Sequence, residues 1–232
     1  MNTNINEPIS LVVFDMAGTT VEDSGLVQQS FLAADHHAGL SKTDADRDEM
    51  LRYVSETMGQ SKIVVFRHLA RGNEEQAQAA NKEFERCYGQ LVAEGNCSAI
   101  PGAEETITSL RSRGIKTALT TGFARETQTA IIDALGWHDL ADLVLCPEPG
   151  MRGRPYPDMP LTALMRTETD SVRSMIVLGD TSSDVISGLR AGARASIGVL
   201  TGAHNTAQLS EAGATHIIDS VAELPSLVAT LA

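Results

Sequence analysis

Cysteine is scarce in this sequence, and long apolar runs are absent. The three cysteines are odd in number and lack the spacing of metal ligands, which favours unpaired thiols in a reducing compartment: Cys87, Cys97 and Cys146. No apolar run approaches the roughly 20 residues that span a bilayer. Residues 1–8 lack the basic and then apolar pattern of a secretory signal. We therefore expect a cytoplasmic protein that makes no contact with a membrane.

An excess of basic residues is also absent. The chain has 18 Lys and Arg against 30 Asp and Glu, a formal net charge of −12. Binding to nucleic acid requires clustered Lys and Arg, so we expect no nucleic-acid partner. With 232 residues, of which 42% are hydrophobic, the chain can bury a core as one large domain or as a domain with an insertion.

Strand-like runs are missing from residues 24–98, where we expect helices at 26–37, 43–57, 61–70 and 74–94. Elsewhere strands and helices alternate, which predicts an α/β fold with a Rossmann-like doubly wound parallel sheet. The expected strands are 11–14, 115–119, 143–145, 175–178, 195–199 and 216–218, and the expected helices are 103–113, 125–135, 159–166, 185–191, 206–212 and 221–231. The sheet domain would comprise residues 1–23 and 99–232, with the all-helical domain 24–98 inserted after the first strand.

The first strand ends in a polar loop. Leu11 to Phe14 form an apolar run typical of a strand buried on both faces, and Asp15 follows it directly. Gly18 allows a tight turn, and Thr19 and Thr20 add hydroxyls beside the carboxylate. The carboxyl ends of such strands are where open α/β sheets bind ligands. Asp15 is thus either part of a binding site or a simple turn residue.

Two further strand ends favour a binding site over a simple turn at Asp15. Thr120-Thr121-Gly122 follows the second strand and Gly179-Asp180 the fourth, so both can converge on Asp15. Asp180 alone could be a helix N-cap. Two carboxylates packed together need a compensating cation, and hard oxygen ligands favour Mg²⁺.

These motifs resemble the haloacid dehalogenase superfamily of hydrolases, and the resemblance covers the whole chain with residues 24–98 as the cap domain. The matching motifs are Asp15 to Thr20, Thr120, Arg154, and Gly179-Asp180 with Asp184. The resemblance implies that Asp15 is the nucleophile and forms an aspartyl-phosphate. It also implies Mg²⁺ held by Asp15, the backbone carbonyl of Ala17 and Asp180, with Asp184 in support. The residues implied to bind the substrate or its phosphoryl group are Thr120, Thr121, Gly122, Arg154, Met58 and Gly59.

Ala17 departs from the phosphatases of this superfamily, which place a second Asp there as the general acid for an alkoxide leaving group. The phosphonatase branch, which hydrolyses phosphonoacetaldehyde, resembles this chain more closely. It shares the Asp-x-Ala-Gly-Thr-Thr form, the Gly153-Arg154-Pro155 element and a Met-Gly-x-x-Lys element, here Met58 to Lys62. In that branch the lysine forms a Schiff base, so the C–P bond breaks toward an enamine. The alternative for Lys62 is a solvated helix lysine.

Two departures separate the chain from that branch. Val65 stands where phosphonatases have a histidine, and Asp23-Ser24-Gly25 lacks the cysteine they have after the first motif. We therefore expect a phosphonatase-like relative that acts on a small phosphonate or phosphate ester. The alternatives are a phosphoglycolate-type phosphatase and a non-catalytic sensor of a phosphorylated ligand.

The first helix of the inserted segment also suggests a homodimer. Its apolar residues, which could pair two subunits through the cap, are Leu26, Val27, Phe31 and Leu32.

Overall fold

The computed structural model describes residues 7–231 and contains a six-stranded parallel sheet in the order β3-β2-β1-β4-β5-β6. The expected strands are confirmed to within one residue at each end. Their bounds are β1 Leu11–Asp15, β2 Lys116–Thr120, β3 Leu143–Leu145, β4 Met175–Gly179, β5 Ala195–Val199 and β6 His216–Ile218.

Side chains of the central strand β1 alternate between two apolar layers. Val12 and Phe14 pack in one core with α5, α6 and α10, whereas Leu11 and Val13 pack in a second core with α7 and α8. Helices therefore cover both faces, and the Rossmann-like doubly wound fold is confirmed. These helices, with α9 beside α8 and β6, are α5 Ala103–Ser112, α6 Arg125–Leu135, α7 Asp158–Arg166, α8 Ser182–Ala191, α9 Thr206–Glu211 and α10 Leu224–Leu231.

Helix α8 begins three residues earlier than expected. Thr181 and Asp184 form a capping box, in which the Thr181 side chain accepts from the Asp184 N–H and Asp184 accepts from the Thr181 N–H. This box satisfies orphan donors of the first turn. Because the N-cap is Thr181, the alternative that Asp180 is a simple N-cap is wrong.

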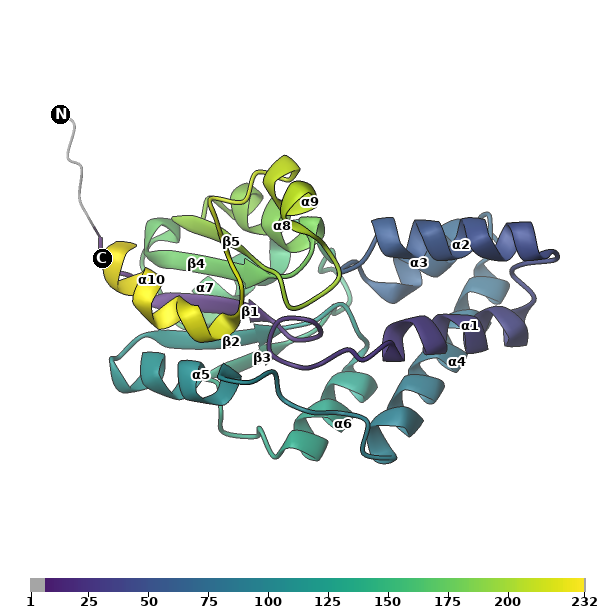
Figure 1. Ribbon diagram of the computed structural model, residues 1–232, viewed down its shortest axis with the longest axis horizontal. Coiled ribbons are helices and arrows are strands. Elements are labelled where there is room, and N and C mark those ends of the chain that lie inside the picture. The colour runs from purple at the N-terminus through teal and green to yellow at the C-terminus, as the bar shows by residue number, and fades with distance from the viewer. Residues whose placement is uncertain (1–6, 232) are drawn as a thin grey trace.

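Four helices follow β1 and lie together at the end of the sheet where the strands finish (Figure 1). Phe31 of α1 lies in the core between them, 4.9 Å from the ring centroids of both Phe66 and Phe84. We refer to residues 24–98 as the helical segment. Its helices are α1 Leu26–Ala38, α2 Asp44–Glu56, α3 Lys62–Leu69 and α4 Glu74–Ala93.

The apolar face of α1 does not support the expected dimer. Leu26, Val27 and Phe31 are buried inside the chain, where α1 packs against α4, and Leu32 is half-buried. The homodimer stays a prediction, but the surface that suggested it is already covered.

The three cysteines are unpaired, as expected. Every helix among residues 7–231 is too short or too polar to cross a membrane.

Candidate active site

The chain order of the strands reverses beside β1, which creates a crevice at the carboxyl ends of β1 and β4. Asp15 is the last residue of β1 and pairs in register with Thr120, while Asp180 directly follows β4. Both carboxylates are almost fully buried, at 5% and 3% exposure. The convergence expected from the two strand ends is therefore present.

A tight loop after Asp15 brings the two carboxylates together. The backbone N–H groups of Thr19, Thr20 and Val21 all donate to the Met16 carbonyl, at 2.8–3.1 Å. Gly18 has φ +85° and lies directly against Asp180, so that a Cβ at residue 18 would lie 2.5 Å from Asp180 Oδ2. Only glycine adopts this φ without strain and also leaves room for the Asp180 carboxylate.

Asp180 is held from two sides. Its Oδ1 accepts from the Thr19 hydroxyl at 3.2 Å, and its Oδ2 accepts from the Ala203 N–H at 2.7 Å. The Thr201 hydroxyl in turn donates to the Gly18 carbonyl at 2.7 Å. The loop 201–203 carries no motif, which is why the sequence did not point to it.

Arg154 is the cation of this site. Its Nη1 lies 2.5 Å from Asp15 Oδ1 and 2.6 Å from Asp184 Oδ1, and its Nη2 donates to Thr120 Oγ1 at 2.9 Å. The guanidinium is buried, and so are both carboxylates. Such a cluster is stable only when its charges compensate one another, because the groups have lost their hydration.

Thr120 does not face the cavity in the way that we expected of a phosphate ligand. Its hydroxyl donates to the Phe14 carbonyl at 2.9 Å and accepts from Arg154, so its single donor is occupied. Thr121 and Gly122 line the cavity instead. Successive side chains alternate along an extended chain, so of the two threonines expected to bind phosphate it is Thr121, and not Thr120, that lines the cavity.

Arg154 alone does not neutralise the acidic cluster. Burial and the nearby Asp184 carboxylate raise the pKa of Asp15 to about 7, although Arg154 opposes the shift. Burial and the Asp15 carboxylate raise the pKa of Asp180 well above its usual range. Two adjacent buried acids therefore resist ionising together unless another cation joins them.

A divalent cation fits this donor set. One carboxylate oxygen each from Asp15, Asp180 and Asp184 can lie within 4.8 Å of the others. The Ala17 carbonyl accepts no hydrogen bond from the described residues. Carboxylate and carbonyl oxygens are the ligands that Mg²⁺ prefers. These residues could therefore hold Mg²⁺, with Asp184 also engaged by Arg154 and by the capping box.

A cavity of about 500 Å³ lies over the acidic cluster and is shared by the sheet and the helical segment. From the sheet side it is lined by Asp15, Ala17, Thr121, Gly122, Arg154 and Asp180, and from the helical segment by Met58, Gly59 and Lys62. Apart from Thr120 and Asp184, the structure thus brings every site residue expected from the sequence to one cavity.

Lys62 is the first residue of α3, and it is only 5% exposed. Its Nζ lies 5.2 Å from the ring centroid of Phe123 and 5.8 Å from those of Phe31 and Phe84. Its Nζ makes no hydrogen bond or ion pair with the residues that the structure describes. Burial lowers the pKa of Lys62, against the opposing charges of Asp23 and Glu85. The alternative of a solvated helix lysine is wrong.

Glycines allow the loop before Lys62 to approach the strand ends closely. Gly59 has φ +81°, and a Cβ there would overlap the Thr181 hydroxyl. A Cβ at Gly122 would lie 2.6 Å from the Gln60 carbonyl oxygen. The Lys62 N–H donates to the Gly122 carbonyl at 3.4 Å. This close backbone packing positions Lys62 over the site.

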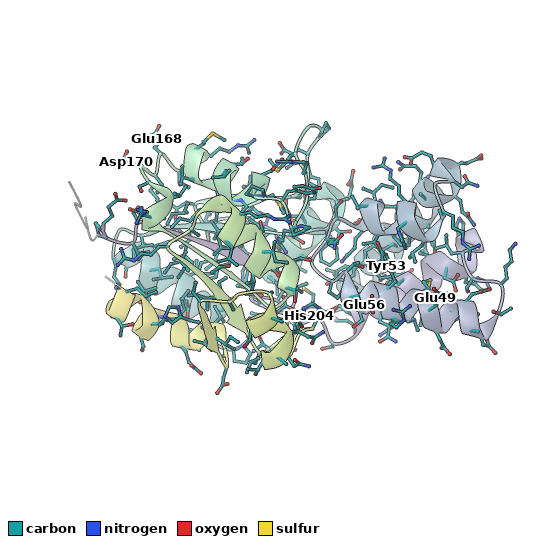
Figure 2. The ribbon with its side chains drawn as sticks, turned by 90° about the horizontal axis from the view of Figure 1, so that it is seen from above. Glu49, Tyr53, Glu56, Glu168, Asp170 and His204 are labelled. Carbon is teal, nitrogen blue, oxygen red and sulfur yellow. The ribbon has the colours of Figure 1, made fainter. Side chains whose placement is uncertain are left out.

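Two polar contacts that the sequence did not suggest join the helical segment to the sheet domain. His204 Nδ1 accepts from the Ser182 N–H at 2.9 Å, so Nε2 holds the proton and donates to the Ser55 carbonyl at 3.2 Å. Figure 2 shows His204 at the junction between the two parts of the molecule. Glu85 of α4 accepts from the Ala124 N–H at 3.3 Å and from the Thr127 hydroxyl, at the start of α6.

Comparison with known proteins places this site in a family. A family model described as haloacid dehalogenase-like hydrolase matches residues 9–192, so the chain belongs to that family and is a hydrolase. A phosphonoacetaldehyde hydrolase of Bacillus cereus is 31% identical over 215 residues, covering 84% of this chain and 76% of the relative. The "Probable phosphatase IndB" of Dickeya dadantii is 29% identical over 217 residues, covering 92% of this chain and 91% of the relative.

Solved structures show the same fold. A hydrolase from Pseudomonas syringae superposes with a TM-score of 0.83 at 21% identity, covering 96% of this chain and 99% of its own. A phosphonoacetaldehyde hydrolase-like protein from Oleispira antarctica superposes with a TM-score of 0.82 at 24% identity, covering 100% of this chain and 96% of its own.

Gly18→Ala should abolish Mg²⁺ binding, because the new methyl group would displace the Asp180 carboxylate. Gly39→Ala is the matched control, since Gly39 also has positive φ but has open space around its Cβ position. Each variant should lose about 1–2 kcal/mol of stability from backbone strain. Thermal unfolding and titration calorimetry with Mg²⁺ check this, and equal Mg²⁺ affinities in the two variants would contradict it.

Lys62→Met should raise the melting temperature at pH 7 by about 2 °C or more, because it removes a buried amine that resists protonation. The lysine pKa is lower in the folded than in the unfolded state, so its destabilising effect is present at neutral pH and vanishes as the pH rises toward 10.5. Thermal melts from pH 7 to pH 10 measure the difference. Lys82→Met, at an exposed position, should show no such trend; identical trends would refute the assignment.

Proposed function

We propose that this hydrolase is a Mg²⁺-dependent enzyme that cleaves the C–P bond of a small aldehyde phosphonate of the phosphonoacetaldehyde type. The observation that carries the proposal is Lys62: a buried amine without an ion pair or hydrogen bond among residues 7–231, in the same cavity as Asp15. The unprotonated amine is the form of lysine that attacks a carbonyl, and a lowered pKa increases the share of that form. The similarity to phosphonoacetaldehyde hydrolases supports the same reaction class.

The helical segment would act as a cap that covers the site and presents Lys62. The Lys62 amine condenses with the aldehyde of the substrate, takes up one proton and releases water, forming an iminium ion. Asp15 then attacks phosphorus as the C–P bond breaks, and the bonding electrons pass to the iminium to give an enamine. Water hydrolyses the resulting aspartyl-phosphate. The enamine takes up a proton at carbon to give an iminium ion again, and hydrolysis of that ion releases the aldehyde product and frees Lys62.

Ala17 fits this chemistry. An alkoxide leaving group requires a general acid, and loss of such an acid typically costs about 10²–10⁴-fold in rate. An enamine leaving group requires no proton on oxygen when the bond to phosphorus breaks. Alanine at residue 17 is therefore compatible with C–P cleavage, whereas its backbone carbonyl can still ligate a cation.

The phosphoryl group would lie between Asp15 and Thr121, with Arg154 and the backbone N–H groups of the loop after Asp15 compensating its charge. Mg²⁺ would be held by Asp15, Asp180 and the Ala17 carbonyl, with support from Asp184. It would neutralise the negative charges by which the Asp15 carboxylate and the phosphoryl group repel each other. In this arrangement Thr120 orients Arg154 rather than the substrate.

A phosphomonoesterase of the phosphoglycolate type is the second candidate, and the relative from Dickeya dadantii named as a phosphatase favours it. A sensor that binds a phosphorylated ligand without turnover is disfavoured, because the complete set of Asp15, Arg154 and Asp180 is not needed for binding alone. A cytoplasmic location is proposed from the unpaired cysteines.

Borohydride should attach phosphonoacetaldehyde covalently to Lys62, because reduction traps an imine. Peptide mass spectrometry locates the adduct, and Lys62→Ala should lose both the adduct and turnover while Lys82→Met keeps both. Hydrolysis of phosphate esters that survives in Lys62→Ala, with no adduct in the wild type, would favour the phosphomonoesterase instead. Ligand binding without an aspartyl-phosphate or its beryllofluoride analogue would favour the sensor.

Removal of divalent cations with EDTA should abolish turnover, and Mg²⁺ should restore it, because Asp15 and Asp180 resist ionising together without a cation. Phosphate release from the substrate measures the effect. Full activity in EDTA would contradict the metal assignment.

A further inference from the structure

Imine formation needs an acid–base group that the sequence motifs do not supply. The lysine ammonium must lose a proton before it attacks, and the hydroxyl of the tetrahedral adduct must gain one before it leaves as water. Val65, one turn after Lys62, is apolar and buried. Within the described part of the chain no histidine lines the cavity: His68 stacks on Tyr53 at 4.0 Å, and both ring nitrogens of His204 are engaged elsewhere.

Three carboxylates influence the charge of Lys62: Asp23, Glu85 and Asp15. Asp15 is paired with Arg154, and both oxygens of Glu85 accept hydrogen bonds at the start of α6. Asp23 differs from both. It accepts only from backbone N–H groups at the start of α1, including Val27 at 3.0 Å, and lines the same cavity as Lys62.

Asp23 and Lys62 face the cavity without touching each other, since no ion pair joins them. Burial raises the pKa of Asp23 and lowers that of Lys62, so both shifts favour the neutral acid and the neutral amine over the ion pair. Burial therefore brings the two pKa values closer together, which favours transfer of a proton between the groups, and both side chains line one cavity of about 500 Å³ that can admit a substrate carbonyl.

A buried hydroxyl near Asp23 lacks a partner. The Tyr88 hydroxyl has no hydrogen bond within the described residues, and Asp23 is its foremost charged neighbour. Its ring packs 4.5 Å from the Phe123 centroid, and Phe123 also contacts Lys62. An unsatisfied buried hydroxyl costs about 1–3 kcal/mol, so Tyr88 is an unused donor packed behind Phe123, which does line the cavity.

We propose that Asp23 is the proton-transfer residue for imine formation at Lys62, a role that rests on the proposed function. The Asp23 carboxylate takes one proton from the Lys62 ammonium, leaving a neutral amine and a carboxylic acid. The amine nitrogen bonds to the aldehyde carbon, the C=O π electrons move to oxygen, and a nitrogen-bound proton passes to that oxygen. Asp23 then protonates the hydroxyl, which leaves as water while the nitrogen lone pair forms the iminium. Asp23 is again a carboxylate.

Asp23→Asn tests this role, because asparagine keeps an oxygen that can accept from the Val27 N–H but cannot transfer the proton. Quenched-flow borohydride trapping of phosphonoacetaldehyde should show adduct formation at Lys62 slowed by about 10²-fold or more. Asp23→Glu, which keeps a carboxyl, should recover most of the rate. Glu75→Gln is the control for loss of a negative charge, since Glu75 is exposed and is not among the residues that line the cavity, and its trapping rate should stay close to that of the wild type.

Chemical rescue separates proton transfer from a structural role. In Asp23→Gly, added formate should restore adduct formation in proportion to its concentration, whereas chloride at equal ionic strength should not. An adduct that forms as fast in Asp23→Asn as in the wild type, or a formate effect that chloride reproduces, would overturn the role of Asp23 and leave the imine intact. Absence of any adduct in the wild type would overturn the proposed function and the role of Asp23 together.

Discussion

Three buried carboxylates meet where β1 and β4 end, and the surrounding structure compensates their charge. Asp15 and Asp184 share Arg154, and Asp180 receives a backbone N–H and a hydroxyl. Gly18 leaves the space that the Asp180 carboxylate occupies. Burial, and the incomplete balance of one guanidinium against three carboxylates, raise the pKa values of Asp15 and Asp180, and a divalent cation fits the cluster. The crevice made by the reversal of strand order thus holds a cluster of donor atoms that fits a divalent cation.

Lys62 lies in the same cavity, but its amine has too little negative charge around it, whereas the carboxylates have too little positive charge. Its amine lies among three phenylalanine rings, and the carboxylates around it are paired or out of contact. The aromatic environment excludes water but offers no full counter-charge, so the neutral amine is favoured. Under the proposed function, the cavity combines the nucleophile Asp15 with an amine that forms an imine, a combination that C–P cleavage requires and ordinary ester hydrolysis does not.

The sequence predicts the parts of the site that depend on local pattern. Apolar runs ending in polar residues identified β1 and β4, and the common edge of parallel strands brought Asp15 and Asp180 together. Arg154 and Lys62 followed only from the resemblance to known hydrolases. Both Thr120 and Thr121 were expected to bind phosphate, and the sequence did not show that only Thr121 lines the cavity, because that depends on which side of the strand end faces it. His204 and Glu85 were missed, since their partners lie in distant parts of the chain. The apolar face of α1 was visible, but periodicity alone does not show whether α4 or a second subunit covers it.

The central claim is that burial lowers the pKa of the Lys62 amine, so that more of it is unprotonated than of an exposed lysine. The most direct measurement is the pKa of its side chain, obtained by NMR titration of ¹⁵N-labelled lysine with the Lys62 signal assigned through Lys62→Met. A pKa well below the ordinary 10.5 is the predicted result. A pKa equal to or above that of the exposed Lys82 would contradict the account.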